Sequence, residues 1–173
     1  MERCVTSTRI YDGQSLNLHV DQVMMGNGKT TKREVVEHHG AAAIVPVTET
    51  GGVVLVRQYR YAIATNLLEV PAGTMEQCET PEQCAGRELE EETGYKSMRI
   101  EKIMEFFPVP GYSTEKIHVY LAKGLIKAKM HTEDDEKIEV EIMPFQRALE
   151  KIRLGEIRDA KSICALYRAA ELL

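Results

Sequence analysis

The alternation of apolar and polar residues in the first third of the chain predicts β-strands. Residues 4–11 and 16–25 alternate loosely on either side of Asp12-Gly13, a pair that is typical of a tight turn between two strands. The apolar runs at residues 41–47 and 53–59 have the length of buried strands. We expect further strands at residues 31–38, 98–107, 117–121 and 138–143.

Helix start and stop signals interrupt these strands. Thr80 can cap a helix, Pro81 suits its first position, Gln83 completes a capping box, and Gly94 is typical of its end. Two further helices are predicted at residues 145–154 and 159–172. Helices interspersed among antiparallel strands favour an α+β sandwich, preceded by an N-terminal antiparallel β-hairpin region.

Composition and charge exclude several classes of protein. The chain has 173 residues, of which 43% are hydrophobic and 28% are charged, so a folded domain is expected rather than a disordered chain. A net charge of −5 without a basic stripe disfavours a nucleic-acid binder or a membrane-surface binder. No apolar run is long enough to span a membrane, and no signal peptide is visible, so we expect a cytoplasmic protein. The cysteines form no C-x-x-C pair and are predicted to be free thiols in or near the core.

Acidic side chains gather on one face of the first predicted helix. At 3.6 residues per turn, Glu88 and Glu92 lie one above the other, and Glu91 falls within the same arc. These carboxylates repel each other, and a hard cation such as Mg²⁺ turns the repulsion into coordination. Arg87 is placed to pair with Glu91, and a backbone carbonyl from residues 71–73 can supply a further oxygen ligand. The alternative is a solvated acidic surface, the usual role of a charge run.

This segment resembles the box of the Nudix hydrolases, G-x5-E-x7-R-E-U-x-E-E-x-G-U, in which U is a bulky apolar residue. The matching residues are Gly73, Glu79, Arg87, Glu88, Leu89, Glu91, Glu92, Gly94 and Tyr95. The resemblance implies an α/β/α sandwich that hydrolyses a nucleoside diphosphate linked to another group, with Mg²⁺ or alternatively Mn²⁺ as cofactor. It assigns Glu88, Glu92 and the carbonyl of Ala72 to the metal, Glu91 to a further or water-mediated ligand, and Arg87 to orienting these groups.

Segments outside the box resemble the ADP-ribose pyrophosphatase branch of this family. They comprise residues 56–60, 68–73 and 158–162 and the pair Pro110-Gly111. The branch implies hydrolysis of ADP-ribose to AMP and ribose 5-phosphate. Candidate substrate contacts are Arg33, Arg60, Glu69, Pro110, Gly111 and Tyr11, with Arg60 on a phosphate, Tyr11 stacked on adenine and Glu69 accepting from its amino group. The alternative role of Arg60 is a surface salt bridge, and the alternative role of Tyr11 is simple packing.

The branch also implies an assembly and a catalytic base. Its N-terminal strands exchange between subunits, so we expect a homodimer, with residues 1–38 as the dimerising strands and residues 39–173 as the hydrolase domain. The resemblance places the base on the acidic loop before residue 138, at Asp134 or alternatively Glu133, and a metal-assisting acid at Glu136. A solvated loop is the competing interpretation, in which case Glu115 is the next candidate base.

Two other functions stay open at this point. One is the same chemistry on another nucleoside diphosphate derivative, such as an ADP-sugar, a dinucleotide or an oxidised nucleotide. The other is a catalytically silent nucleotide-binding module. Silent relatives are expected to lose a metal-binding glutamate, and this chain keeps them all.

Overall fold

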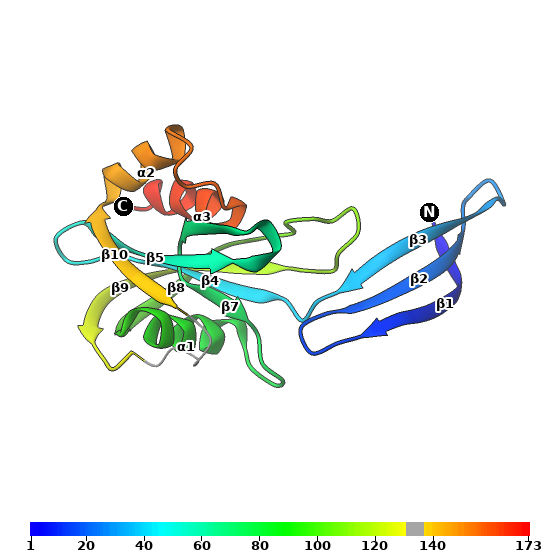
Figure 1. Ribbon diagram of the computed structural model, residues 1–173, viewed down its shortest axis with the longest axis horizontal. Helices are drawn as coiled ribbons and strands as arrows, with labels where there is room; N and C mark the ends of the chain where they lie inside the picture. Colours follow the sequence, from blue (N-terminus) through cyan, green and yellow to red (C-terminus); the bar gives the residue numbers. More distant parts are fainter. Residues whose placement is uncertain (131–136) are drawn as a thin grey trace. The chain divides into compact units, whose positions relative to one another are not determined.

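Figure 1 shows the computed structural model of the chain, which describes residues 1–130 and 137–173. Contacts divide the chain into two compact units. The larger unit comprises Ala41–Phe106 and Ile117–Leu173, and the smaller unit comprises Met1–Gly40 and Phe107–Lys116. In the part of the chain that is described, no helix is both long enough and apolar enough to cross a membrane.

The smaller unit is built on a three-stranded antiparallel sheet. Its strands are β1 (Arg3–Asp12), β2 (Asn17–Met24) and β3 (Thr30–Glu37), in that spatial order. The hairpin predicted around Asp12-Gly13 is confirmed, since Asp12 pairs with Asn17 and the Gly13 N–H donates to the Leu16 carbonyl. Every residue of β1 is exposed. Among the described residues, Val23 is the one buried hydrophobic side chain of this unit.

The larger unit contains two further sheets. One has the order β7 (Ala72–Thr74), β4 (Ala41–Pro46), β9 (Ile117–Lys127) and β8 (Tyr95–Phe106), with β4 and β9 parallel. The other has the order β10 (Ile138–Pro144), β5 (Gly52–Arg60) and β6 (Thr65–Glu69), all antiparallel. A short 3₁₀ turn, η1 (Tyr61–Ile63), joins β5 to β6. Strands β6 and β7 were not predicted from the sequence, and β9 is longer than predicted.

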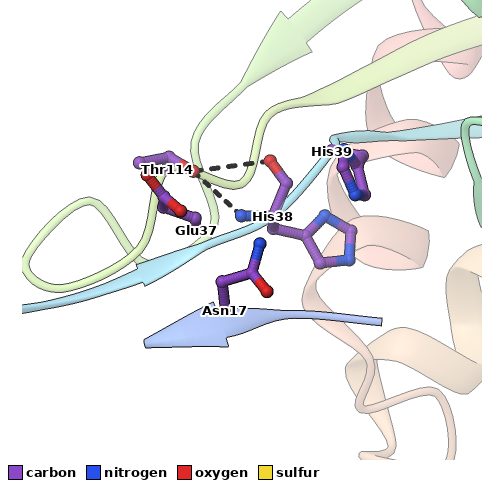
Figure 2. A pocket seen from close by; sticks show the side chains of 5 residues that line it. All are labelled: Asn17, Glu37, His38, His39 and Thr114. Atoms are coloured by element: carbon purple, nitrogen blue, oxygen red, sulfur yellow. Dashed lines mark hydrogen bonds between the residues drawn. The ribbon is translucent and has the colours of Figure 1, made fainter. Parts of the chain in front are cut away.

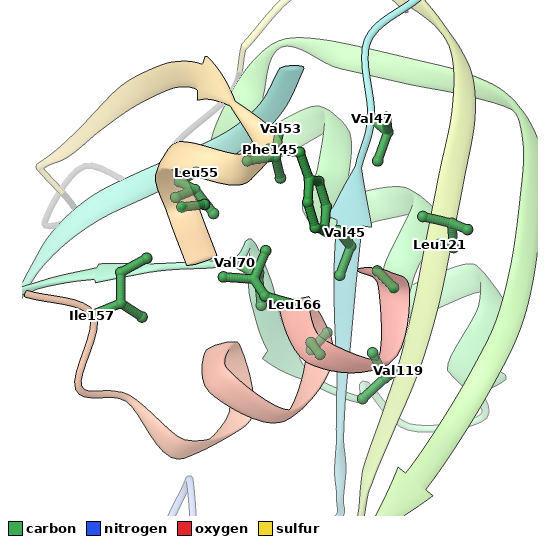
Figure 3. Packing of buried hydrophobic residues seen from close by; sticks show 14 of the residues in the cluster. Val45, Val47, Val53, Leu55, Val70, Val119, Leu121, Phe145, Ile157 and Leu166 are labelled. Atoms are coloured by element: carbon green, nitrogen blue, oxygen red, sulfur yellow. The ribbon is translucent and has the colours of Figure 1, made fainter. Parts of the chain in front are cut away.

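Helices cover both faces of the sheet that contains β4. Every residue of β4 is buried, as expected for a strand with both faces covered. Ala43 and Val45 belong to one apolar cluster with Leu166 of helix α3 (Ala160–Ala170). Figure 3 labels Val45 and Leu166 in this cluster. Ala42 and Ile44 belong to a second cluster, with Cys84, Ala85 and Leu89 of helix α1 (Pro81–Thr93). Because successive strand residues point to opposite faces, α1 and α3 lie on opposite sides, which confirms the α/β/α sandwich.

Both predicted ends of helix α1 are confirmed. The Thr80 hydroxyl accepts from the Gln83 N–H, and the Gln83 side chain accepts from the Thr80 N–H at 2.9 Å, so the capping box is complete. Gly94 ends the helix with φ of 69°, a left-handed conformation that glycine adopts without a Cβ clash. Helix α2 (Phe145–Arg153) follows β10 directly and contacts α3. The cap signals at Thr80 and Gly94 fix where helix α1, the acidic helix, begins and ends.

Candidate active site

The acidic face of helix α1 is the predicted metal site. Glu88 and Glu92 are buried, with exposed fractions of 9% and 4%, whereas the Glu91 side chain is 37% exposed. Ala85 and Leu89 are fully buried in the apolar cluster beside them. The helix therefore holds two carboxylates out of water at one edge of the core, which is costly unless other groups bond to them.

The backbone of strand β7 meets these two carboxylates. A Cβ placed on Gly73 would lie 1.8 Å from Oε1 of Glu88, so only glycine leaves room for that carboxylate. The Ala72 N–H donates to Oε2 of Glu92 at 3.0 Å. The site thus joins one short strand to one helical face.

Arg87 bonds to three of the carboxylates of this acidic cluster. Its Nε and Nη2 bond to the two oxygens of Glu79 at 2.9 and 3.0 Å. Its Nη1 donates to Glu88 at 2.6 Å and to Glu91 at 2.9 Å, so the predicted contact between Arg87 and Glu91 forms. The hydrogen bonds with Glu79 raise the pKa of Arg87, and the same bonds lower the pKa of Glu79. Arg87 therefore stays charged and fixes the orientation of three carboxylates.

The donor set fits a hard divalent cation. Across residues 1–130 and 137–173, no three His, Cys, Asp or Glu side chains are already arranged as metal ligands. Arg87 bonds to Glu88 and Glu91, and the Ala72 N–H bonds to Glu92. These acids are therefore already stabilised by a cation and by a backbone N–H group. Carboxylate and carbonyl oxygens are the ligands that Mg²⁺ takes. Because Gly73 has no side chain, the Glu88 carboxylate has the space that it occupies.

Cys84 is a buried thiol that lies beside these acids. Burial raises the pKa of Cys84 to about 12, so the group remains a protonated thiol at neutral pH. Its Sγ donates to the Gly73 carbonyl at 3.5 Å. All four cysteines are free, as predicted, but Cys4, Cys78 and Cys164 are exposed, so the expectation that all four lie in or near the core was wrong.

Arg60 and Glu69, two of the predicted substrate contacts, bond to each other. Arg60 donates from Nε and Nη2 to the two oxygens of Glu69, at 3.0 and 2.8 Å. Glu69 is 1% exposed, and Lys161 at the start of α3 also bonds to it. The Glu92 carboxylate contributes to the raised pKa of Arg60, after the larger effect of its bond to Glu69, so Arg60 lies in the electric field of the acidic face. The sequence did not indicate Lys161, although its segment at residues 158–162 was singled out.

The remaining predicted substrate contacts belong to the smaller unit. Arg33 bonds to the two carboxylate oxygens of Glu2, at 2.5 and 3.1 Å. Tyr11 is 57% exposed, and its ring lies against Gly13, where a Cβ would meet Cε1 at 2.3 Å. Pro110 and Gly111 are exposed in the loop that follows β8. The structure therefore brings Ala72, Arg87 and the acids together in the larger unit, and leaves these four residues in the other unit.

A cavity of about 280 Å³ also lies in the smaller unit. Figure 2 shows the residues that line it, namely Asn17, Glu37, His38, His39 and Thr114. The Thr114 hydroxyl accepts from the His38 N–H at 3.0 Å, and the Gly40 N–H donates to Nδ1 of His38 at 3.0 Å. None of the residues that the sequence assigned to metal, catalysis or substrate lines this cavity.

Three predicted residues, Glu133, Asp134 and Glu136, lie outside the described residues. The base predicted on this loop therefore stays a prediction. Glu115, the next candidate, is half-buried in the smaller unit, where its N–H donates to the Ser113 hydroxyl at 3.1 Å.

Comparison with known proteins defines the family. Residues 37–166 match the NUDIX domain. An ADP-ribose pyrophosphatase from Bacillus subtilis (strain 168) is 38% identical over 167 residues, covering 95% of this chain and 90% of that protein. A GDP-mannose pyrophosphatase from Cronobacter sakazakii (strain ATCC BAA-894) is 41% identical over 145 residues, covering 78% and 75%. A crystal structure of an ADP compounds hydrolase superposes with a TM-score of 0.88 at 19% identity, covering 99% of this chain and 94% of that one.

This chain therefore belongs to the Nudix family and is a Nudix hydrolase. Members of this family generally need a divalent metal ion. The fold class expected from the sequence is confirmed by both the family match and the structural neighbour.

Proposed function

We propose that this protein hydrolyses the pyrophosphate bond of ADP-ribose in a Mg²⁺-dependent reaction. Water attacks one of the two phosphorus atoms, the bond from that phosphorus to the bridging oxygen breaks, and the products are AMP and ribose 5-phosphate. The observation that carries the proposal is the acidic face of α1, where buried Glu88 and Glu92 meet the backbone of Ala72 and Gly73. The similarity to an ADP-ribose pyrophosphatase over 95% of the chain supports the substrate.

The residues of the acidic face divide into ligands and supports. Glu88, Glu92 and the Ala72 carbonyl hold Mg²⁺ directly, and Glu91 holds it directly or through water. Mn²⁺ suits the same oxygen donors. The bound ion supplies the positive charge that a pyrophosphate needs before water can attack it. Arg87 restrains the carboxylates through its bonds to Glu88 and Glu91, so that they need little reorganisation.

Arg60 is the candidate phosphate contact of the larger unit. It binds a phosphate of the substrate through the edge of its guanidinium that faces away from Glu69. The resemblance to the ADP-ribose pyrophosphatase branch supports Arg33, Tyr11, Pro110 and Gly111 as further substrate contacts, with Tyr11 stacked on the adenine. The sequence also assigns Glu69 to the adenine amino group. Since its carboxylate is already bonded by two cations, its proposed action on the substrate passes through Arg60.

The general base is proposed on the loop that precedes β10. Asp134 is the first candidate to take the proton from the attacking water, Glu133 is the alternative, and Glu136 assists with the metal. A carboxylate close to a divalent cation stays ionised at neutral pH, so it can accept a proton there. If Glu133→Gln lowers kcat more than Asp134→Asn does, the alternative base is the correct one.

The N-terminal strands, residues 1–38, are proposed to form a cytoplasmic homodimer in which they exchange between subunits, leaving residues 39–173 as the hydrolase domain. The exposure of all of β1 supports this assembly, as do the exposed apolar side chains Val5, Ile10 and Leu16. A three-stranded sheet with one buried hydrophobic residue needs another apolar surface to be stable. A second copy of the chain supplies such a surface, and the adenine side of the site would then draw on both subunits.

A panel of nucleotides tests this function. ADP-ribose, ADP-glucose, GDP-mannose, flavin adenine dinucleotide and an 8-oxo nucleoside triphosphate are each incubated with the enzyme and Mg²⁺, and the products are separated by chromatography. We expect the highest kcat/KM with ADP-ribose, and AMP as its product. Preference for GDP-mannose or another compound would contradict the substrate but not the chemistry. Binding of these compounds without turnover would favour a silent nucleotide-binding module instead.

A further inference from the structure

The carboxylate of Glu69 is shared between two cations that come from distant parts of the chain. Arg60, at the end of β5, bonds to both of its oxygens, and Lys161, in the first turn of α3, bonds to Oε2. Glu69 is 1% exposed, the Lys161 side chain is 15% exposed, and the Arg60 side chain is 38% exposed. The cluster therefore contains a buried anion, Glu69, and a cation that is partly exposed to solvent, Arg60.

The charges of this cluster decide what Arg60 offers to a ligand. If Glu69 had Arg60 as its sole partner, the pair would be neutral and the guanidinium would be held mainly by the carboxylate. Lys161 adds a second positive charge on the same oxygen and also pairs with Asp159, so the two cations and two carboxylates of this cluster balance. Without the charge of Lys161, the cluster would carry one net negative charge beside Arg60, its most exposed member. A guanidinium in a balanced cluster binds a phosphate more tightly than one in a cluster with net negative charge.

The other acid beside Lys161 has its own partners. Asp159 caps helix α3, and its Oδ2 accepts from the Ser162 N–H at 2.9 Å and from the Ser162 hydroxyl at 2.6 Å. The helix N-terminus also carries a partial positive charge that offsets an acid at this position. Although Lys161 bonds to Asp159 at 2.9 Å, the balance of charge at Glu69 still depends on Lys161.

The start of α3 does not need Lys161 to stay in place. The Ser162 hydroxyl, which is fully buried, accepts from the Val70 N–H at 2.9 Å, and this bond ties the helix to the segment that follows β6. Asp159 and Ser162 therefore anchor the helix, whereas Lys161 contributes charge. A change at Lys161 should alter the electrostatics of Glu69 with little effect on the backbone.

We propose that Lys161 is a positioning residue for substrate binding: by sharing the Glu69 carboxylate, it offsets that negative charge and leaves the Arg60 guanidinium available to a phosphate of the substrate. The inference rests on the proposed function, in which Arg60 contacts that phosphate. Lys161 itself does not touch the substrate. Its effect reaches the ligand only through Glu69 and Arg60.

The test is a double-mutant cycle on KM, measured with whichever nucleotide of the panel is hydrolysed best. Lys161→Met removes the charge, and Lys161→Gln removes it while keeping a hydrogen-bond donor at the same place. Each should raise KM by about tenfold and change kcat by less than about twofold, because the lost charge weakens binding before the chemical step. In a Glu69→Gln background, Lys161→Met should change KM by less than about twofold, since the carboxylate through which it acts is gone.

Lys151→Met is the matched control. The Lys151 side chain is 17% exposed, which is similar to that of Lys161. Lys151 lies on α2 and forms an ion pair with Glu156, which lies in the turn after α2, and neither residue bonds to Glu69 in the part of the chain that the structure describes. The KM of the Lys151→Met variant should equal that of the wild type, even if the melting temperature of this variant falls as much as that of Lys161→Met.

Two results would overturn the inference. One is an unchanged KM in both Lys161 variants, and the other is an equal KM change with and without the Glu69 carboxylate. Preference for a nucleotide other than ADP-ribose contradicts the substrate assignment alone, because the cycle is then run on that nucleotide. Failure to hydrolyse every compound of the panel would overturn the proposed function and this inference together.

Discussion

Replacing Glu92 by glutamine separates the catalytic use of the acidic face from its structural use. The glutamine keeps an oxygen that can accept from the Ala72 N–H, now as a neutral bond at the same place. Weakening that bond costs about 1 kcal/mol, while removing the repulsion with Glu88 one turn away returns about 0.2–0.5 kcal/mol. The melting temperature without metal should therefore stay within about 3 °C of the wild type, because 1 kcal/mol shifts a domain of this size by about 2–4 °C.

The same substitution should nearly abolish turnover. Loss of one direct metal ligand removes about 4 kcal/mol of charge stabilisation from the reaction, and each 1.36 kcal/mol is a factor of ten, so kcat should fall about a thousandfold. Saturating Mg²⁺ at about 100 times its dissociation constant should stabilise the wild type by about 2.7 kcal/mol. The variant should lose most of the corresponding rise in melting temperature.

Calorimetric melting with and without Mg²⁺ and steady-state kinetics on ADP-ribose check both halves of this prediction. Glu90→Gln is the control, because Glu90 pairs with Lys96 at 3.1 Å on another face of the same helix. A Glu92→Gln enzyme that keeps more than about a tenth of the wild-type kcat at saturating Mg²⁺ would refute the direct-ligand role.

Three further predictions concern other parts of the molecule. Deleting residues 1–38 should give a monomer, measured by light scattering, that has no hydrolase activity. A folded and active monomer would contradict a site shared between subunits. Gly73→Ala should displace the Glu88 carboxylate, because the new Cβ would lie 1.8 Å from Oε1, so the Mg²⁺ concentration for half-maximal rate should rise; an unchanged value would place Glu88 outside the site. Asp134→Asn should lower kcat by about 10²–10⁴-fold at constant KM, and Glu136→Gln should raise the Mg²⁺ requirement. If these two variants and Glu133→Gln all stay within about threefold of the wild type, the base lies elsewhere, with Glu115 as the next candidate.

Local signals made the acidic helix predictable from the sequence. The capping box at Thr80 and the glycine at position 94 act on neighbouring residues, so their geometry follows from the chain itself. The helical repeat then fixes which acids share a face. The contact of Arg87 with Glu91 follows from the same spacing.

Contacts between distant segments were beyond the sequence. Glu69 and Lys161 are separated by 92 positions, and no pattern in either segment specifies the other. The alternatives for Arg60, a phosphate ligand or a salt bridge, could not be decided because the burial of Glu69 depends on how β5, β6 and α3 pack. Strand β7 was not predicted because it also depends on a distant segment: its three residues form a strand by pairing with β4.

Hydrolysis of ADP-ribose in ¹⁸O-labelled water, followed by ³¹P NMR, tests the central claim most directly. With Mg²⁺, the account predicts that the two pyrophosphate signals are replaced by two phosphomonoester signals, one of them shifted by a single ¹⁸O atom. Both changes should stop when a chelator is added and should be nearly absent with Glu92→Gln. Unchanged pyrophosphate signals with Mg²⁺, or equal rates in the wild type and Glu92→Gln, would contradict the assignment of this chain as a metal-dependent ADP-ribose hydrolase.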